Sequence, residues 1–116
     1  MEMKVITQPI FREEIVKMAK NQFGDLVKAV VDVEQEIMVV GGELHADGEV
    51  LLVEEHGSKR ENTWGINLYT EKSKEEWIEF DSMINLKPSS GNRSRSVEDI
   101  DMQKKIRHIV GKLVTM

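Results

Sequence analysis

The clearest pattern in the sequence is an alternation of apolar and polar residues from 77 to 86. Ile78, Phe80, Ile84 and Leu86 fall on one side of this alternation, and mostly polar residues fall on the other. Because successive side chains of a β-strand point to opposite faces of its sheet, the alternation predicts a half-buried strand. Pro88 lacks a backbone N–H and therefore ends the predicted strand.

Two segments show the spacing of amphipathic helices. We predict one helix over residues 11 to 22, ended near Gly24, which can supply a left-handed cap. We predict a second helix over residues 97 to 114, where Ser96 followed by Asp99 resembles a capping box. The apolar residues that share a face in these two helices are Phe11, Ile15, Met18, Met102, Ile106, Ile109, Val110 and Leu113.

The remaining apolar segments have the character of β-strands. Residues 26 to 34 and 37 to 41 are rich in β-branched side chains, and their short separation predicts a hairpin. Residues 63 to 70 alternate and predict a second hairpin with residues 77 to 87, across a solvated connection. The MKVI sequence within residues 1 to 8 predicts a short edge strand.

Residues 48 to 56 fit two structures. Their apolar positions suit a helical face, but the Val-Leu-Leu-Val run also suits a buried strand. Asp47 before the segment and Gly57 after it are typical of an N-cap and a C-cap, so we predict a short helix.

Together these elements predict an α+β fold. We expect one domain over residues 1–116, with an antiparallel sheet of about four strands and two or three helices, mainly on one face. The helices at 11–22 and 97–114 would cover the apolar face. The 44–56 segment or a second subunit would cover the opposite face, which would display Lys28, Asp32, Asn67, Asp81 and Asn85.

Composition narrows the function classes. The net charge of −5 argues against general nucleic-acid binding, which needs a positive field. The chain contains no cysteine, which excludes disulfides, thiolate metal sites and cysteine nucleophiles. Neither a leader pattern nor an apolar run of about 18 residues is present, so we expect a cytoplasmic protein without membrane contact.

The polar segment from 89 to 96 is the first candidate site. Arg93 and Arg95 lie there without an intervening acid and precede a predicted helix. Guanidinium groups and the N–H groups of a helix N-terminus both suit anions, so an anion could be held by Ser90, Asn92, Arg93 and Arg95. The alternative is structural, with the arginines paired to Glu98, Asp99 and Asp101 to order the turn.

The Gly-Gly-Glu-Leu-His-Ala-Asp segment from 41 to 47 is the second candidate. Glu43, His45 and Asp47 carry atoms that can bind metals, but one histidine with two carboxylates makes a poor closed site. We therefore expect no tightly bound metal and no cofactor. The alternative role of Asp47 is to cap the helix that follows.

Several segments, among them GELHAD, WGINLY, WIEFDSMIN and GNRSR, resemble an uncharacterised prokaryotic family, a domain of unknown function. The resemblance covers nearly the whole chain and implies a small cytoplasmic domain without an assigned activity. Members of that family more often carry glycine in the first hairpin turn, where this chain has Gln35 and Glu36.

Two functional hypotheses follow. The first is a module that binds a small anionic or phosphorylated ligand, or a protein partner, through the loop from 89 to 96. A homodimer is predicted separately, because small domains commonly pair with a second copy. The second is a hydrolase or transferase for a phosphate-containing substrate, with His45 or Asp81 as acid or base and Arg93 and Arg95 as the anion clamp. P-loop, Rossmann and nucleophile-elbow motifs are not present in the sequence.

Overall fold

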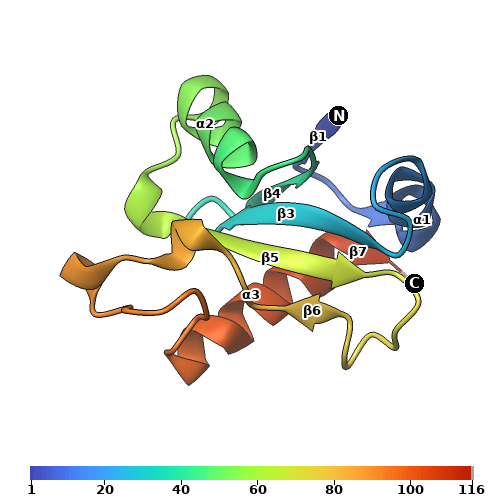
Figure 1. The fold of residues 1–116 in the computed structure, drawn as a ribbon. Coiled ribbons are helices and arrows are strands. Elements are labelled where there is room, and N and C mark those ends of the chain that lie inside the picture. Colours follow the sequence, from blue (N-terminus) through green and yellow to red (C-terminus); the bar gives the residue numbers. More distant parts are fainter. Residues whose placement is uncertain (116) are drawn as a thin grey trace.

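A computed structural model of the chain describes residues 1–115, which form an α+β fold. A twisted sheet occupies the centre, with α2 on one side and α3 on the other (Figure 1). The elements in chain order are β1 (Met3–Ile6), β2 (Ile10–Phe11), α1 (Arg12–Asn21), β3 (Leu26–Asp32), β4 (Ile37–Gly41), α2 (His45–His56), η1 (Arg60–Asn62), β5 (Thr63–Tyr69), β6 (Ile78–Glu79), η2 (Met83–Asn85), η3 (Pro88–Ser90), α3 (Ile100–Leu113) and β7 (Val114–Thr115).

The main sheet has five antiparallel strands in the order β1-β4-β3-β5-β6. The longest pairing joins β3 to β5, from Leu26 opposite Tyr69 to Asp32 opposite Thr63. The two predicted hairpins, the edge strand at β1 and the α+β class are confirmed. Outside this sheet, β2 and β7 form a short parallel pair near the two ends of the chain.

Both faces of the sheet are covered. On one face, Val27, Ala29 and Val31 pack with the apolar residues of α1 and α3 in the larger core. On the other face, Val30 packs with Leu52 of α2 in a smaller core. Burial on both faces explains why β4 is a continuous apolar run and why β3 carries apolar residues on both of its faces.

Helix α2 approaches the sheet closely because of one glycine. A Cβ at Gly48 would lie 2.9 Å from Cγ1 of Val39, so a larger residue would push the helix away from β4. The next residue, Glu49, is buried and accepts hydrogen bonds from Thr63 Oγ1 and Arg60 Nη1, each at 2.6 Å. The structure confirms that residues 48 to 56 are helical, and these contacts show that the segment covers the second face.

A buried carboxylate organises the turn between β3 and β4. Asp32 accepts hydrogen bonds from the backbone N–H groups of Glu34 and Gln35, from the Gln35 side chain and from Ser58 Oγ. Glu36 completes the turn with a φ of 57°, a left-handed conformation that favours glycine. A glycine at this position would adopt the same conformation without steric cost.

The strand predicted over residues 77 to 87 is wrong beyond its first part. Only Ile78 and Glu79 pair with β5, and the chain then leaves the sheet for a 3-10 turn capped by Ser82. The side chain of Asn85 makes the hydrogen bonds that a neighbouring strand would make with Gly65. Its Oδ1 accepts from the backbone N–H of Gly65, and its Nδ2 donates to the carbonyl oxygen of Gly65. Ile84 therefore packs in the smaller core, on the face opposite Phe80, although the alternation put them together.

Two predicted helix starts are also wrong. Helix α3 begins at Ile100 and is capped by Asp99, which accepts from Asp101 N–H, so Ser96 does not cap it. Asp47 lies inside the first turn of α2, after the N-cap position at Leu44, and caps nothing. Short polar residues are common near helix starts, so pattern alone does not select the one that caps. Within the described residues, no helix has both the length and the apolar character needed to cross a bilayer.

Replacement of Asp32 by alanine should destabilise the fold. Four buried or part-buried hydrogen bonds to the carboxylate would be lost, and we expect the free energy of unfolding to fall by about 2–4 kcal/mol. Burial alone would raise the pKa of Asp32, but its hydrogen bonds from Ser58, Gln35 and Glu34 outweigh burial and lower it. The lowered pKa stabilises the fold above the unfolded-state pKa, and this contribution is lost as the pH falls through the folded-state value.

Urea unfolding of wild type and Asp32→Ala across pH 3 to 7 would measure both effects. The difference in unfolding free energy between the two proteins should narrow toward the acid end. Glu61→Ala removes an exposed carboxylate and serves as the control. Equal stability of Asp32→Ala and wild type at neutral pH would contradict the role assigned to Asp32.

Candidate functional site

The loop from Lys87 to Glu98 is held in place by the side chain of Asn92. Asn92 is buried, its Nδ2 donates to the carbonyl oxygens of Asn85, Ser94 and Ser96, and its Oδ1 accepts from Glu98 N–H at 2.9 Å. These bonds use both polar atoms of the Asn92 side chain. The structure thus gives this predicted ligand-binding residue an internal bracing role.

The two arginines of the loop have different surroundings. Arg95 Nε donates to Asp81 Oδ1 at 2.7 Å, in a pair where both side chains are about half exposed. The Arg93 side chain is exposed, and its backbone N–H donates to Glu98 Oε2. Ser90 is exposed at the end of η3. An anion site on this loop stays a prediction. At such a site, Arg95 would have to bind the anion while it remains paired with Asp81.

The structure brings the two candidate acid–base residues to one place. His45, the first residue of α2, lies with its Nε2 2.8 Å from the carbonyl oxygen of Ile66. Since a carbonyl oxygen only accepts, Nε2 carries the proton. Asp81 lies close enough to influence the charge of His45, and Arg95 pairs with that carboxylate. The sequence named these residues but could not place them together.

Asn67 on β5 stands at the centre of this polar cluster. Its Nδ2 donates to Glu79 Oε1 at 2.8 Å and more weakly to the carbonyl oxygen of Asp81. Its Oδ1 is buried beside His45 without a well-formed hydrogen bond in the described part of the chain. The sequence pattern predicted Asn67 on the face of the sheet opposite the apolar face and indicated no role for it. Within residues 1–115, no group of three or more acidic, histidine or cysteine side chains could hold a metal ion.

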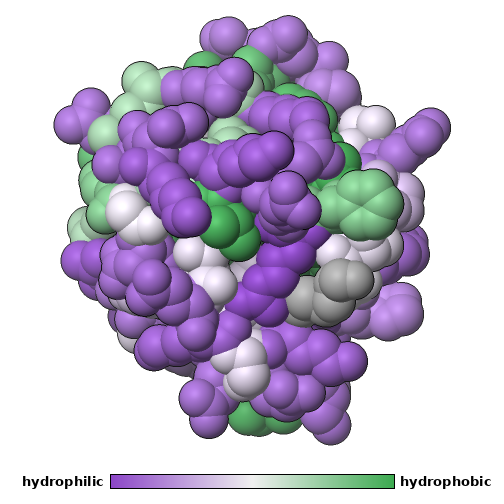
Figure 2. Space-filling model, turned by 90° about the vertical axis from the view of Figure 1, so that its right-hand side faces the viewer, coloured by the Kyte–Doolittle hydropathy of each residue, from purple (hydrophilic) through white to green (hydrophobic). Residues whose placement is uncertain are grey.

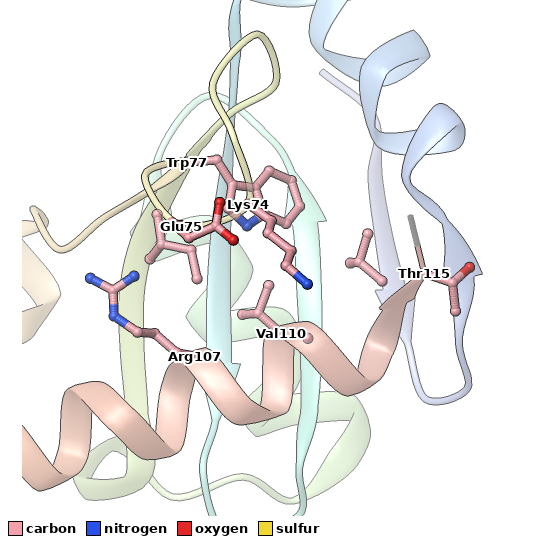
Figure 3. Close-up of a pocket in the computed structure, with 9 residues that line it drawn as sticks. Lys74, Glu75, Trp77, Arg107, Val110 and Thr115 are labelled. Atoms are coloured by element: carbon pink, nitrogen blue, oxygen red, sulfur yellow. The ribbon is translucent and has the colours of Figure 1, made fainter.

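A cavity of about 530 Å³ lies on the opposite side of β6, between the β5–β6 loop and the C-terminal part of α3. Figure 3 shows Lys74 and Glu75 reaching from the loop over Trp77, with Arg107 and Val110 on the helix facing them. The remaining lining residues are Ile78, Gly111, Val114 and Thr115.

The floor of this pocket is rigidly held. Trp77 is almost fully buried, and the Arg12 guanidinium lies 4.3 Å from the centre of its ring. The same guanidinium donates to the carbonyl oxygens of Thr70 and Lys72, so it also anchors the loop that carries Lys74. The apolar part of the pocket and the loop above it are therefore fixed by one residue from α1.

The sequence pattern did not predict this pocket. Lys74 and Glu75 belong to a segment interpreted as a solvated connection, and Trp77 was assigned to the polar face of a strand. The signal in the sequence was Gly111, an isolated glycine inside an otherwise regular helical pattern, which often has a packing or functional reason.

A comparison with known protein families shows which family the chain belongs to. The profile of a family described as protein of unknown function (DUF5674) matches residues 4–113. The chain belongs to this DUF5674 family. Neither a search of curated proteins nor a search of solved structures found a match.

The DUF5674 match contains β2 to α3 and nearly all of β1, and so includes the polar cluster and most of the pocket. Family membership confirms the resemblance to a domain of unknown function and assigns no activity. A function must therefore be inferred from the geometry of the chain itself.

Acidification should weaken the fold through His45. Burial lowers the pKa of His45, and nearby Lys28 adds to this, while the bond to Ile66 and the proximity of Asn67 and Asp81 oppose it. A histidine with a lowered pKa stabilises the fold fully above its unfolded-state value of about 6.5. That contribution is lost as the pH falls from about 6.5 to the folded-state pKa.

The measurement is chemical unfolding of wild type and His45→Gln between pH 4.5 and 8. Wild type should lose stability more steeply than His45→Gln as the pH falls below about 6.5. His56→Gln and His108→Gln remove exposed histidines and should follow the wild-type curve. Parallel curves for wild type and His45→Gln would show that His45 is not buried in its neutral form.

Proposed function

We propose that this DUF5674 domain binds a small organic anion with an apolar body, in the pocket between α3 and the β5–β6 loop. The supporting observation is a cavity of about 530 Å³ with an apolar floor and charged groups at its mouth. Small-molecule sites have volumes of roughly 300–1,000 Å³ and combine apolar walls with a few polar groups.

The apolar floor accounts for the body of the ligand. Trp77, Ile78, Val110 and Val114 line the cavity and also belong to the larger core of the domain. Because these side chains are held by the core, the surface that they offer is largely formed before a ligand arrives. Preorganisation of this kind lowers the entropy cost of binding.

Two cations at the mouth of the pocket are the reason for proposing a negatively charged ligand. Lys74 and Arg107 line the mouth, and neither forms a hydrogen bond or an ion pair with another described residue. The Arg107 guanidinium lies 5.1 Å from the centre of the Phe80 ring. In a chain with a net charge of −5, two cations without an acidic partner among the described residues favour an anionic ligand at this apolar pocket.

Gly111 lies beside open space at the cavity. A Cβ added at this position would meet no atom within 4 Å, so the space beside the helix is free. Glycine inside a helix costs about 0.5–1 kcal/mol relative to alanine. A residue that weakens the helix and leaves space at a pocket is consistent with a binding role.

A protein partner is less well supported on the side of the molecule drawn in Figure 2. Charged and polar side chains cover most of that side, and apolar side chains show as separate spots. Protein-binding surfaces usually have a continuous apolar centre. The homodimer expected from the sequence stays a prediction.

Acid–base catalysis at the polar cluster is a second candidate. It is favoured by the proximity of His45 to Asp81, whose side chain is 44% exposed and can reach solvent. The lowered pKa of His45 would keep its ring neutral and able to accept a proton. Release of phosphate from an aryl phosphate, lost on His45→Gln, would support catalysis; no release by wild type would exclude this substrate class.

Octanoate should bind to the wild-type domain and change the fluorescence of Trp77, while octanamide of the same length should bind more weakly. Binding of the acid should fall at least about tenfold in a Lys74→Ala, Arg107→Ala double variant, as expected for loss of charge-assisted contacts. Lys104→Ala removes an exposed cation of the same helix outside the pocket and is the charge control. Equal binding of octanoate and octanamide would contradict an anion site.

Position 111 provides an independent test of the location. Gly111→Phe should place a ring at the cavity and abolish octanoate binding, and its Cβ would meet no atom within 4 Å, so we expect the variant to remain folded. Gly111→Ala should retain binding and raise the unfolding free energy by about 0.5–1 kcal/mol. Unchanged octanoate affinity in Gly111→Phe would place the ligand elsewhere.

A further inference from the structure

We infer that the ligand of the pocket is a zwitterion, an α-amino acid with an apolar side chain. This inference rests on the proposed binding function and refines its ligand class. The observation behind it is Glu75, an acid at the same mouth as the two cations. A pocket for a plain anion has no use for a carboxylate at this position, because like charges repel.

The charges at the mouth are of both signs and none is neutralised within the protein. Lys74, Glu75 and Arg107 all line the cavity, and within the described part of the chain none of them forms a hydrogen bond or ion pair. Figure 3 shows the Lys74 amine extending toward the helix beside Val110, the Glu75 carboxylate beside Trp77, and the Arg107 guanidinium apart from both at the other end of the pocket. The mouth therefore offers separate partners for an anion and for a cation.

An α-amino acid carries both groups on one carbon atom. Its carboxylate suits Lys74 and Arg107, and its ammonium group suits Glu75, which would otherwise repel the carboxylate. Charge-assisted hydrogen bonds of this kind are stronger than neutral ones and specify orientation.

The apolar floor of the pocket then determines which side chain of the amino-acid ligand can bind. Trp77, Ile78, Val110 and Val114 supply no hydrogen-bonding group except the indole N–H. A polar side chain would lose its hydrogen bonds to water there without replacement, whereas a branched aliphatic side chain would lose none. The pocket therefore favours leucine-like amino acids over polar ones.

Glu75 is the residue that distinguishes an amino acid from a simple acid. Isothermal titration with leucine, 4-methylpentanoate and 3-methylbutylamine separates the two charges, because the three molecules share one apolar group. Wild type should bind leucine at least about tenfold more tightly than 4-methylpentanoate, and the amine weakly. In Glu75→Gln, leucine and 4-methylpentanoate should bind equally, because the residue that binds the ammonium group of leucine has lost its charge.

Glu76→Gln is the matched control, since it neutralises the next residue of the loop, which does not line the pocket. It should keep the wild-type preference for leucine. Unfolding curves of the variants verify that each is folded, and Gly111→Phe verifies that leucine occupies the cavity by abolishing its binding.

The outcomes separate the two proposals. Tighter binding of leucine that depends on Glu75 supports both. Equal affinities of wild type for leucine and 4-methylpentanoate, with both lost in Gly111→Phe, overturn the zwitterion and leave the anion pocket standing. Binding of neither these molecules nor octanoate to folded wild type overturns both proposals.

Discussion

The fold depends on burying both faces of one small sheet. The strands β3 and β4 lie inside it, and most of their side chains are apolar on each side. A sheet of this kind is stable only when each face is covered, because exposed apolar area costs free energy in proportion to its size. Helices α1 and α3 cover one face, and α2 covers the other, closely enough to require Gly48.

The short edge strand β6 allows the segments on either side of it to form the pocket and the polar cluster. This strand pairs with β5 through only two residues, and beyond them Asn85 satisfies the backbone of Gly65 with its side chain. The chain before β6 is then free to form a loop above α3, and the chain after it is free to form the braced loop around Asn92. One short strand thus separates the pocket at Trp77 from the polar cluster at Asn67.

These two regions differ in how far their polar groups are satisfied. In the polar cluster, Arg95 is paired with Asp81 within the 80–98 segment, and His45 of α2 donates to a backbone carbonyl of β5, so both contacts serve the fold. At the pocket, Lys74, Glu75 and Arg107 have no such partners among the described residues. Charged groups left without partners beside an apolar cavity are better suited to a ligand than groups that already serve the fold.

Local pattern in the sequence determined the α+β class, the helices near 11–22 and 97–114, the first hairpin and the helical nature of 48–56. These features follow from the periods of helix and strand, which neighbouring residues set by themselves. The end of β6 was not predictable, because Ser82 and Asn85 leave the sheet in response to partners at Arg95 and Gly65. Neither was the pocket, whose walls come from the 74–78 segment, the end of α3 and β7, more than 25 residues apart in places. Only the packing of the helices on the sheet brings such distant segments together, so tertiary structure decided which charged residues serve the fold and which remain free.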